Sequence, residues 1–330
     1  LEFRRVLFRS PPGSTFKPFM ALAALEMGKR TPNQAISDPG FFTFGNHTFR
    51  DDKKGGHGSV DMYKSIVHSC DTYYYMLAND MGIDNIAKFM GSLGLGQRTG
   101  VDLGKDDSGE SKGVLPSQEW KKQRFKKPEQ QKWYAGETIS IGIGQGYNAY
   151  TPIQLAQATA TIANNGVMFR PHLVHYLVDT KTGEKRPVEP QPIRDLQLKP
   201  QNIEVIRRAM IGVNKEGTGT RAFAGAPYEA AGKTGTAQVY SLKGAEYKEH
   251  SVKKELRDHA LFVAYGPVDA TQWGRAERTV DFFDLKGDVE ALLAPLQAEF
   301  VAAEHPAMHP GRCASIRVAG QEVGVLGQRL

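Results

Sequence analysis

Three short motifs follow one another along the chain, and together they restrict the fold more than any other feature. They are Ser14-x-x-Lys17, Ser69-Cys70-Asp71 and Lys233-Thr234-Gly235. Each motif alone is weak, because a serine at a helix start is usually a cap and Lys-Thr-Gly is often a turn. A fold that uses all three has to place a strand carrying Lys233 beside the helix that carries Ser14.

The spacing within the first motif suits a serine nucleophile. A serine hydroxyl attacks poorly at neutral pH and needs a base within reach. A lysine three residues later lies on the same face of a helix, so Lys17 is positioned to accept the proton of Ser14. Burial and a second cation favour the neutral, proton-accepting form of a lysine, and Lys233 is the candidate for that cation.

The third motif suits substrate binding on a strand beside this helix. The Lys233 ammonium and the hydroxyls of Thr234 and Thr236 can hold a substrate carboxylate. Gly235 has no side chain that would block a close approach. The backbone N–H groups of Ser14 and Thr236 can form an oxyanion hole, in which each donor contributes about 3–4 kcal/mol. The motifs therefore predict acyl transfer through a serine.

The composition is that of a globular chain, with 40% hydrophobic and 24% charged residues among 330. This length allows one large domain or two ordinary ones. The net charge of +6 comes without an arginine-rich helix or a basic stripe interleaved with aromatic residues, so nucleic-acid binding is not expected. No apolar run reaches the ~18 residues of a membrane span, and two distant cysteines do not predict a disulfide framework.

Helical spacing, caps and turn residues predict the order of the elements. The first ten residues, LEFRRVLFRS, resemble translated cloning sites and are set aside as a cloning or assembly scar. Residues 31–58 predict a loop, and residues 105–135 predict a long surface excursion. Strands are predicted at 229–240 and 259–267, paired as a hairpin. The predicted helices are 14–28, a segment capped by Ser59, a segment with Tyr73 to Leu77, and then 83–94, 151–164 and 200–214.

Several longer segments resemble one family. They are PPGSTFKP, SCDTYYYMLANDMGID, RFKKP, GETISIGIGQGYNAYTPIQLAQA, AAGKTGTAQV and LRDHALFVAYGP. The three motifs are themselves the signature that penicillin-binding proteins share with class A β-lactamases. Residues of about 11–268 thus resemble the class B penicillin-binding proteins, and among these the elongation-specific peptidoglycan D,D-transpeptidases. The resemblance implies an α/β fold with helices packed on an antiparallel sheet.

The resemblance also implies a role for each motif residue. Ser14 would be the acylated nucleophile and Lys17 its general base, while Ser69 would relay protons to the leaving or attacking amine. Asp71 would be a further catalytic residue, and it stands where many relatives have Asn. The resemblance also implies that the donor peptide is bound by Lys233, Thr234, Gly235 and Thr236. Of these, Lys233 would take part in catalysis as well.

The implied reaction joins two peptidoglycan stem peptides. Ser14 attacks the D-Ala–D-Ala bond of the donor, and an amine of a neighbouring strand resolves the acyl-enzyme; β-lactams such as penicillins would trap Ser14. No cofactor is required. Relatives lie at the periplasmic face of the inner membrane and work with a membrane glycosyltransferase of the elongation machinery. The chain is expected to lack the membrane anchor and the pedestal that precede the catalytic domain in relatives.

The sequence changes character near residue 269. TVDFFDLKGDVEALLAPLQ predicts the start of an acidic amphipathic helix, and CASIRVAGQEVGVLG predicts two strands around Ala319-Gly320. Both segments resemble part of the phenylalanine–tRNA ligase β subunit, and no activity is expected of this fragment. The chain is therefore interpreted as a chimera. It joins the scar at 1–10, a truncated, partial penicillin-binding/serine β-lactamase-like transpeptidase domain at 11–268, and a small foreign α+β tail at 269–330.

Five potential metal ligands, one of them Asp52, fall within the 33 positions from residue 38 to residue 70, and four of them form the candidate set. Two carboxylates, an imidazole and a thiolate form a reasonable tetrahedral set for zinc. A zinc ion there would be structural and would pin the loop to the helix that carries Ser69. Solvated turn aspartates and a cysteine that simply packs are the alternative. The four residues are Asp38, Asp51, His57 and Cys70.

Two other functions stay open at this point. A serine β-lactamase or β-lactam sensor shares the three motifs, but no carboxylate for deacylation is identifiable. An inactive remnant is the second alternative, because a sheet without its outer strands exposes edges and leaves the Ser14 helix poorly packed. The remnant would keep the motifs near their places but have low stability and little or no turnover.

Overall fold

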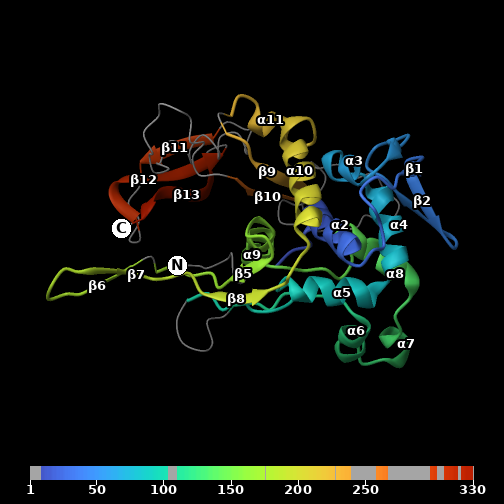
Figure 1. Cartoon of the computed structure of the whole chain (residues 1–330), viewed down its shortest axis with the longest axis horizontal. Helices are drawn as coiled ribbons and strands as arrows, with labels where there is room; N and C mark the ends of the chain where they lie inside the picture. Colours follow the sequence, from blue (N-terminus) through green and yellow to red (C-terminus); the bar gives the residue numbers. More distant parts are fainter. Residues whose placement is uncertain are drawn as a thin grey trace.

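The computed structural model describes residues 9–102, 110–174, 176–226, 228–238, 258–266, 298–302, 308–318 and 321–329. In the larger part of the chain, helices lie around the two-stranded sheet formed by residues 231–237 and 259–265 (Figure 1). The helices are η1 (Gly13–Phe16, a 3₁₀ turn), α2 (Lys17–Glu26), α3 (Met62–Val67), α4 (Asp71–Met81), α5 (Ile83–Ser92), α6 (Gln118–Arg124), α7 (Pro128–Gln131), α8 (Ala135–Gly142), α9 (Pro152–Ala163), α10 (Pro200–Lys215) and α11 (Thr220–Phe223).

The strands are short in the first part of the chain and longer toward its end. They are β1 (Ile36–Asp38), β2 (Phe41–Phe44), β3 (His47–Arg50), β4 (Gly58–Val60), β5 (Val167–Phe169), β6 (Tyr176–Val178), β7 (Lys185–Pro187), β8 (Pro192–Asp195), β9 (Ala231–Ala237), β10 (His259–Tyr265), β11 (Ala298–Ala302), β12 (Met308–Val318) and β13 (Gln321–Arg329). No helix among the described residues combines the length and hydropathy needed to cross a bilayer.

Helix α2 is the centre of the core. Residues 17–25 are all buried, and a helix that is apolar on every side belongs in the interior. Pro18 suits the first turn, where a missing backbone N–H costs no hydrogen bond. The helix packs against α3, α4, α5 and α10. Lys17 is its only buried charged residue, so the fold places one ammonium group inside an apolar core.

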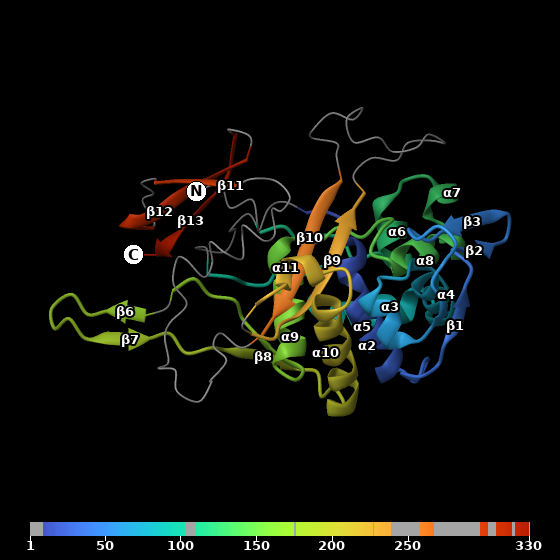
Figure 2. The ribbon, with the colours of Figure 1, turned by 90° about the horizontal axis from the view of Figure 1, so that it is seen from above.

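Strands β9 and β10 form the antiparallel hairpin that the sequence predicts. Their register runs from the pair Ala231–Tyr265 to the pair Ala237–His259, and the connecting loop lies outside the described residues. Helix α10 packs on β9, and α9 contacts β10 (Figure 2). Because β10 covers only one edge of β9, the other edge is open to η1, which lies against it. The helix-flanked antiparallel sheet of the predicted fold class is confirmed.

The prediction of a loop at residues 31–58 is wrong in part, because four short strands form in or at the end of this segment. Strand β1 pairs with β4, and β2 pairs with β3 across Gly45-Asn46. Gly45 has φ +57, the positive value that such tight hairpin turns require. Strands of three or four residues are too short to show an alternating pattern, so only their turn residues were visible in the sequence.

Two other local predictions need correction. Ser59 lies in β4 and is no helix cap; Asp61 caps α3 instead, and its Oδ1 accepts a hydrogen bond of 2.9 Å from the Lys64 backbone N–H. Asp and Ser cap helices about equally well, so the pairing of β4 with β1 decides between them. The surface excursion at 105–135 contains α6 and α7, with Ser117 as the cap of α6. The helices predicted at 14–28, around 73–77 and at 83–94, 151–164 and 200–214 are present, although the first turn of 14–28 is the 3₁₀ turn η1. Thr151 and Gln154 form the capping box of α9.

The two ends of the chain bear on the predicted chimera. Strands β12 and β13 flank Ala319-Gly320 as predicted, and β11 extends them to a three-stranded antiparallel sheet. The helix predicted at 279–297 lies outside the described residues. Ser10, within the segment set aside as a scar, exchanges backbone hydrogen bonds of 3.1 and 2.9 Å with Tyr150.

Candidate active site

The three motifs meet beside strand β9. Ser14 lies in η1 and Lys17 is the first residue of α2. Ser69 and Asp71 lie where α3 gives way to α4, just before and at the first residue of α4. Strand β9 carries the rest of the predicted site, in the order Lys233, Thr234, Gly235 and Thr236.

Lys17 is fully buried and donates three hydrogen bonds. Its Nζ lies 2.5 Å from the Ser69 carbonyl oxygen, 3.1 Å from Ser69 Oγ and 2.6 Å from Asp71 Oδ1. An ammonium has three N–H donors, and these three acceptors use all of them. The Ser14 hydroxyl has no hydrogen-bond partner among the described residues. Lys17 therefore has to release a proton before it can act as a base toward Ser14.

Ser69 connects the two buried lysines. Its hydroxyl oxygen accepts hydrogen bonds from Lys17 Nζ at 3.1 Å and from Lys233 Nζ at 3.0 Å. A serine hydroxyl has two acceptor lone pairs and one donor, so both lone pairs are engaged and the O–H remains for a substrate. Ser69 has φ 60, a conformation that costs a residue with a side chain about 1–2 kcal/mol. The fold holds the hydroxyl between the lysines despite this strain.

Lys233 is also fully buried. Burial lowers the pKa of Lys233 well below its usual range, and the positive charge of Lys17 lowers it further. Its Nζ donates a second hydrogen bond of 2.9 Å to the carbonyl oxygen of Thr234. A lysine with a lowered pKa exchanges protons more readily near neutral pH. Lys233 can therefore take a proton from Ser69 or return one to it.

Two glycines let η1 and β9 approach each other backbone to backbone. A Cβ on Gly13, which has φ +52, would lie 2.2 Å from the carbonyl oxygen of Thr236. A Cβ on Gly235 would lie 2.9 Å from the Thr15 backbone nitrogen. Only glycine fits at either place, so the Ser14 backbone is held beside that of Thr236. An oxyanion hole made of these two N–H groups requires this proximity.

The motifs did not point to three polar residues that border this site. Thr218 lies with its Oγ1 2.5 Å from Thr234 Oγ1, and Gln145 Nε2 donates a bond of 3.1 Å to the Thr236 carbonyl oxygen. Asp52 is exposed, but partial desolvation of its carboxyl group, a hydrogen bond with Asp51 and the charge of Asp71 raise its pKa to about 6. No spacing rule connects these residues with the three motifs, since tertiary packing alone brings them there.

The four predicted metal ligands also come together. One ligand atom of each of Asp38, Asp51, His57 and Cys70 lies within 4.8 Å of those of the other three. Asp38 Oδ2 lies 2.8 Å from His57 Nδ1 and 3.4 Å from Cys70 Sγ. Zinc with ligands at about 2.0–2.3 Å in a tetrahedron needs them about 3.3–3.8 Å apart. The donor set therefore suits zinc in chemistry. In spacing, the Asp38–Cys70 pair fits, whereas Asp38 Oδ2 and His57 Nδ1 would have to move apart by about 0.5 Å or more to hold the ion.

The electrostatics of this cluster are those of a buried group of acids. Burial raises the pKa of the Cys70 thiol. Burial also acts to raise the pKa of Asp38, but hydrogen bonds from Thr72, Gly40 and His57 outweigh it and lower the pKa to about 2. A divalent cation would stabilise the carboxylates and the thiolate together. Because Cys70 follows Ser69 directly, the cluster also fixes one end of the segment that carries Ser69.

Comparison with known proteins identifies the family. Residues 6–276 match the penicillin binding protein transpeptidase domain, and the chain belongs to this family. A peptidoglycan D,D-transpeptidase MrdA from Haemophilus influenzae is 44% identical over 269 residues, which are 78% of this chain and 39% of that protein. The chain thus spans about two-fifths of the length of this curated relative.

Solved structures of relatives support the same assignment. PBP2 from Pseudomonas aeruginosa, in complex with WCK 5153, is 40% identical with a TM-score of 0.64, covering 80% of this chain and 55% of that one. PBP2 from Helicobacter pylori, in complex with MreC, is 31% identical with a TM-score of 0.63, covering 79% and 44%. The predicted penicillin-binding fold is thereby confirmed.

A second similarity covers the end of the chain. Residues 236–328 match the phenylalanyl tRNA synthetase beta chain CLM domain. A phenylalanine–tRNA ligase beta subunit from Burkholderia pseudomallei is 43% identical over 141 residues, which are 42% of this chain and 17% of that protein. The resemblance of the tail is confirmed. The two family matches overlap at residues 236–276, so the boundary at 268/269 stays a prediction.

Proposed function

We propose that the chain carries the catalytic domain of a peptidoglycan D,D-transpeptidase, which cross-links stem peptides during cell-wall elongation through an acyl-enzyme on Ser14. The observation that supports this most is the hydrogen-bonded line from Lys17 through Ser69 to Lys233. It supplies both a proton acceptor and a proton donor next to the nucleophile, as acyl transfer requires.

The first step forms the acyl-enzyme. Ser14 Oγ attacks the carbonyl carbon between the two D-Ala residues of the donor, and its proton passes to the neutral amine of Lys17. The backbone N–H groups of Ser14 and Thr236 stabilise the developing oxyanion. The C–N bond then breaks, and the leaving D-Ala amine takes a proton from the Ser69 hydroxyl, which Lys233 or Lys17 reprotonates.

The second step forms the cross-link. An acceptor amine attacks the ester carbon, the new C–N bond forms, and the bond from carbon to Ser14 Oγ breaks. The excess proton of the amine passes through Ser69, and Ser14 Oγ regains a proton from Lys17. The step consumes one ester and one amine and yields one amide and the free serine, so the enzyme returns to its starting state.

The same proposal includes partners and location. Stem peptides are the substrates, and β-lactams are inhibitors that acylate Ser14. The Helicobacter pylori PBP2 structure in complex with MreC supports a place in the elongation machinery, where a membrane glycosyltransferase would be the working partner. The parent protein would lie at the periplasmic face of the inner membrane.

We expect excess benzylpenicillin to form one stable covalent adduct with the chain, seen by intact mass. The Ser14→Ala variant should form none, because it lacks the attacking oxygen. Rapid loss of the adduct, with turnover of penicillin, would instead favour a serine β-lactamase. No adduct on a sample that melts cooperatively by circular dichroism would identify the chain as an inactive remnant.

We also propose that Asp38, Asp51, His57 and Cys70 hold a structural zinc ion. Three of them come from the β1–β4 region and the fourth adjoins Ser69, so the ion would tie that loop to the start of α4. Metal binding and folding are coupled in such sites. The zinc takes no part in the proposed chemistry, and its role is to keep Ser69 in place.

Elemental analysis should find about one zinc per chain after purification in its presence, with Co²⁺ as a spectroscopic substitute. The cobalt form should show a thiolate-to-metal charge-transfer band that the Cys70→Ser variant lacks. Cys313→Ser, in β12 of the tail sheet, is the matched control and should keep the band. A metal content and spectrum unchanged in Cys70→Ser would rule this site out.

A further inference from the structure

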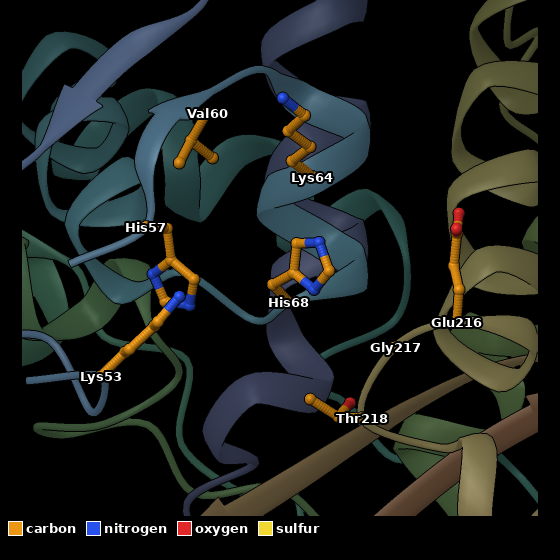
Figure 3. A pocket seen from close by; sticks show the side chains of 8 residues that line it. All are labelled: Lys53, His57, Val60, Lys64, His68, Glu216, Gly217 and Thr218. Carbon is orange, nitrogen blue, oxygen red and sulfur yellow. The ribbon is translucent and has the colours of Figure 1, made fainter.

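A cavity of about 470 Å³ borders the candidate active site and has no role in the chemistry above. This volume lies within the usual range of small-molecule sites, about 300–1,000 Å³. Figure 3 shows Lys53 and His57 on one wall, Lys64 on another and Glu216 opposite, with His68 between them and Thr218 at the edge beside the strands. The polar residues that line it are Lys53, His57, Lys64, His68, Glu216 and Thr218.

The cavity is joined to the catalytic residues at two points. Thr218 lies at its edge and meets Thr234 of β9, with 2.5 Å between the two hydroxyl oxygens. The backbone N–H of Thr218 also donates a bond of 3.3 Å to the carbonyl oxygen of Val67. His68, which also lines the cavity, directly precedes Ser69. A peptide bound between Ser69 and β9 therefore passes the mouth of the cavity if it continues beyond Thr234.

The cavity carries an excess of positive charge from its two lysines. Lys53 and Lys64 are exposed, and neither forms an ion pair with any residue in the described ranges; Lys64 Nζ reaches only the Ser59 carbonyl oxygen at 3.5 Å. The single carboxylate is Glu216, which accepts a hydrogen bond of 2.5 Å from the Tyr63 hydroxyl. Two ammonium groups that form no ion pair with a described residue outnumber one carboxylate that already accepts a hydrogen bond, and this balance favours an anionic ligand.

The side on which the cavity lies indicates which half of the reaction it serves. This step rests on the transpeptidase function proposed above. The leaving D-Ala and the attacking amine occupy the same position at the acyl carbon in the two half-reactions, by microscopic reversibility. The carboxylate of the leaving D-Ala is the group that Lys233 and Thr234 would hold. The acceptor therefore enters on the Thr234 side, where Thr218 opens into the cavity.

We propose that this cavity is a subsite for a carboxylate of the acceptor peptide, with Lys53 and Lys64 supplying the charge. It makes the enzyme selective for amines that carry a carboxylate nearby. Neither lysine touches the reacting atoms, so both act on specificity. The Glu216 carboxylate opposes the ligand and limits its affinity.

The test compares transfer with acylation. A thioester of an N-acyl-D-alanine serves as donor, and glycine, diglycine and triglycine serve as acceptors, each compared with its own C-terminal amide. The three lengths place the carboxylate at three distances from the amine. The measured quantity is the ratio of transfer to the acid over transfer to the amide. Comparing this ratio between variants removes the intrinsic difference in amine reactivity.

The double variant Lys53→Gln/Lys64→Gln should lower this ratio roughly five- to tenfold for at least one acceptor length. Glu216→Gln should raise it, and Lys88→Gln, an exposed lysine on α5, should leave it unchanged. Benzylpenicillin acylation should proceed at the same rate in all of them, because Ser14, Lys17 and Ser69 are untouched.

The outcomes separate the two proposals. An unchanged ratio at all three lengths in the double variant, with normal acylation, would overturn the acceptor subsite and leave the transpeptidase function standing. Acylation without transfer to any acceptor in the unmodified chain would also overturn the subsite. No acylation in the unmodified chain would overturn the proposed function, and the subsite with it.

Discussion

Replacing Lys17 by methionine is expected to slow the acylation of Ser14 by benzylpenicillin by about 10²–10⁴-fold, the usual contribution of a general base. Methionine fills most of the buried volume and carries no proton acceptor. Lys17 contacts Ser69 and Asp71 through three hydrogen bonds, so the substitution also removes the group that holds these two residues together. The rate is measured as adduct formation against time by intact mass.

The substitution also affects stability, and a second variant separates the two effects. Lys17→Met leaves Asp71, which is 16% exposed, without its cation, and breaking such a pair costs about 3–5 kcal/mol. In Lys17→Met/Asp71→Asn the lone charge is gone, so the melting temperature should recover while acylation stays slow. Acylation by the double variant at the unmodified rate would contradict the role of Lys17 as the base.

Local sequence patterns were enough to predict the parts of the site that depend on backbone geometry. Ser14 and Lys17 are separated by less than one helical turn, which fixes their mutual distance before any tertiary contact forms. Strands β9 and β10 show apolar residues next to a long charged connection, and they pair as that pattern predicts. The cluster around Cys70 was also predictable, because the chemistry of its four side chains is specific even when their spacing in sequence is not.

The pairing of buried charges was not predictable in the same way. The spacing of Ser14 and Lys17 predicts that they face each other, yet the Lys17 ammonium is bound to Ser69 and Asp71, some fifty positions away in sequence. An ammonium buried in an apolar core takes whichever acceptors the neighbouring helix offers. The choice therefore depends on how α2 packs against the start of α4, which no local pattern encodes.

The residues on the acceptor side of the site could not be predicted from local sequence patterns either. Thr218 lies between α10 and α11, and nothing in its neighbourhood predicts contact with Thr234. The cavity beside it is lined from the β3–β4 connection, from α3 with its C-cap and from the end of α10. The first two segments adjoin each other within residues 53–68, and the third, residues 216–218, is far from them in sequence, so the cavity exists only once α10 has packed beside α3.

Replacing Gly13 by alanine is expected to reduce acylation by about 10²-fold or more. The new Cβ would lie 2.2 Å from the carbonyl oxygen of Thr236, a distance that has to grow by about 1 Å before the contact is tolerated. A displacement of about 1 Å at a catalytic group costs about 10²-fold in rate. Here the displaced groups are the Ser14 nucleophile and the backbone N–H groups of Ser14 and Thr236, which form the proposed oxyanion hole.

Gly45→Ala is the matched control for this prediction. Gly45 has φ +57, close to the φ +52 of Gly13, but a Cβ there would meet nothing within 4 Å. Both variants carry the same cost of about 1–2 kcal/mol for a left-handed backbone, so any difference between them reports the clash with β9. Gly45→Ala should lose some thermal stability and keep its acylation rate. Equal acylation rates in the two variants would mean that the close approach of η1 to β9 does not position the nucleophile.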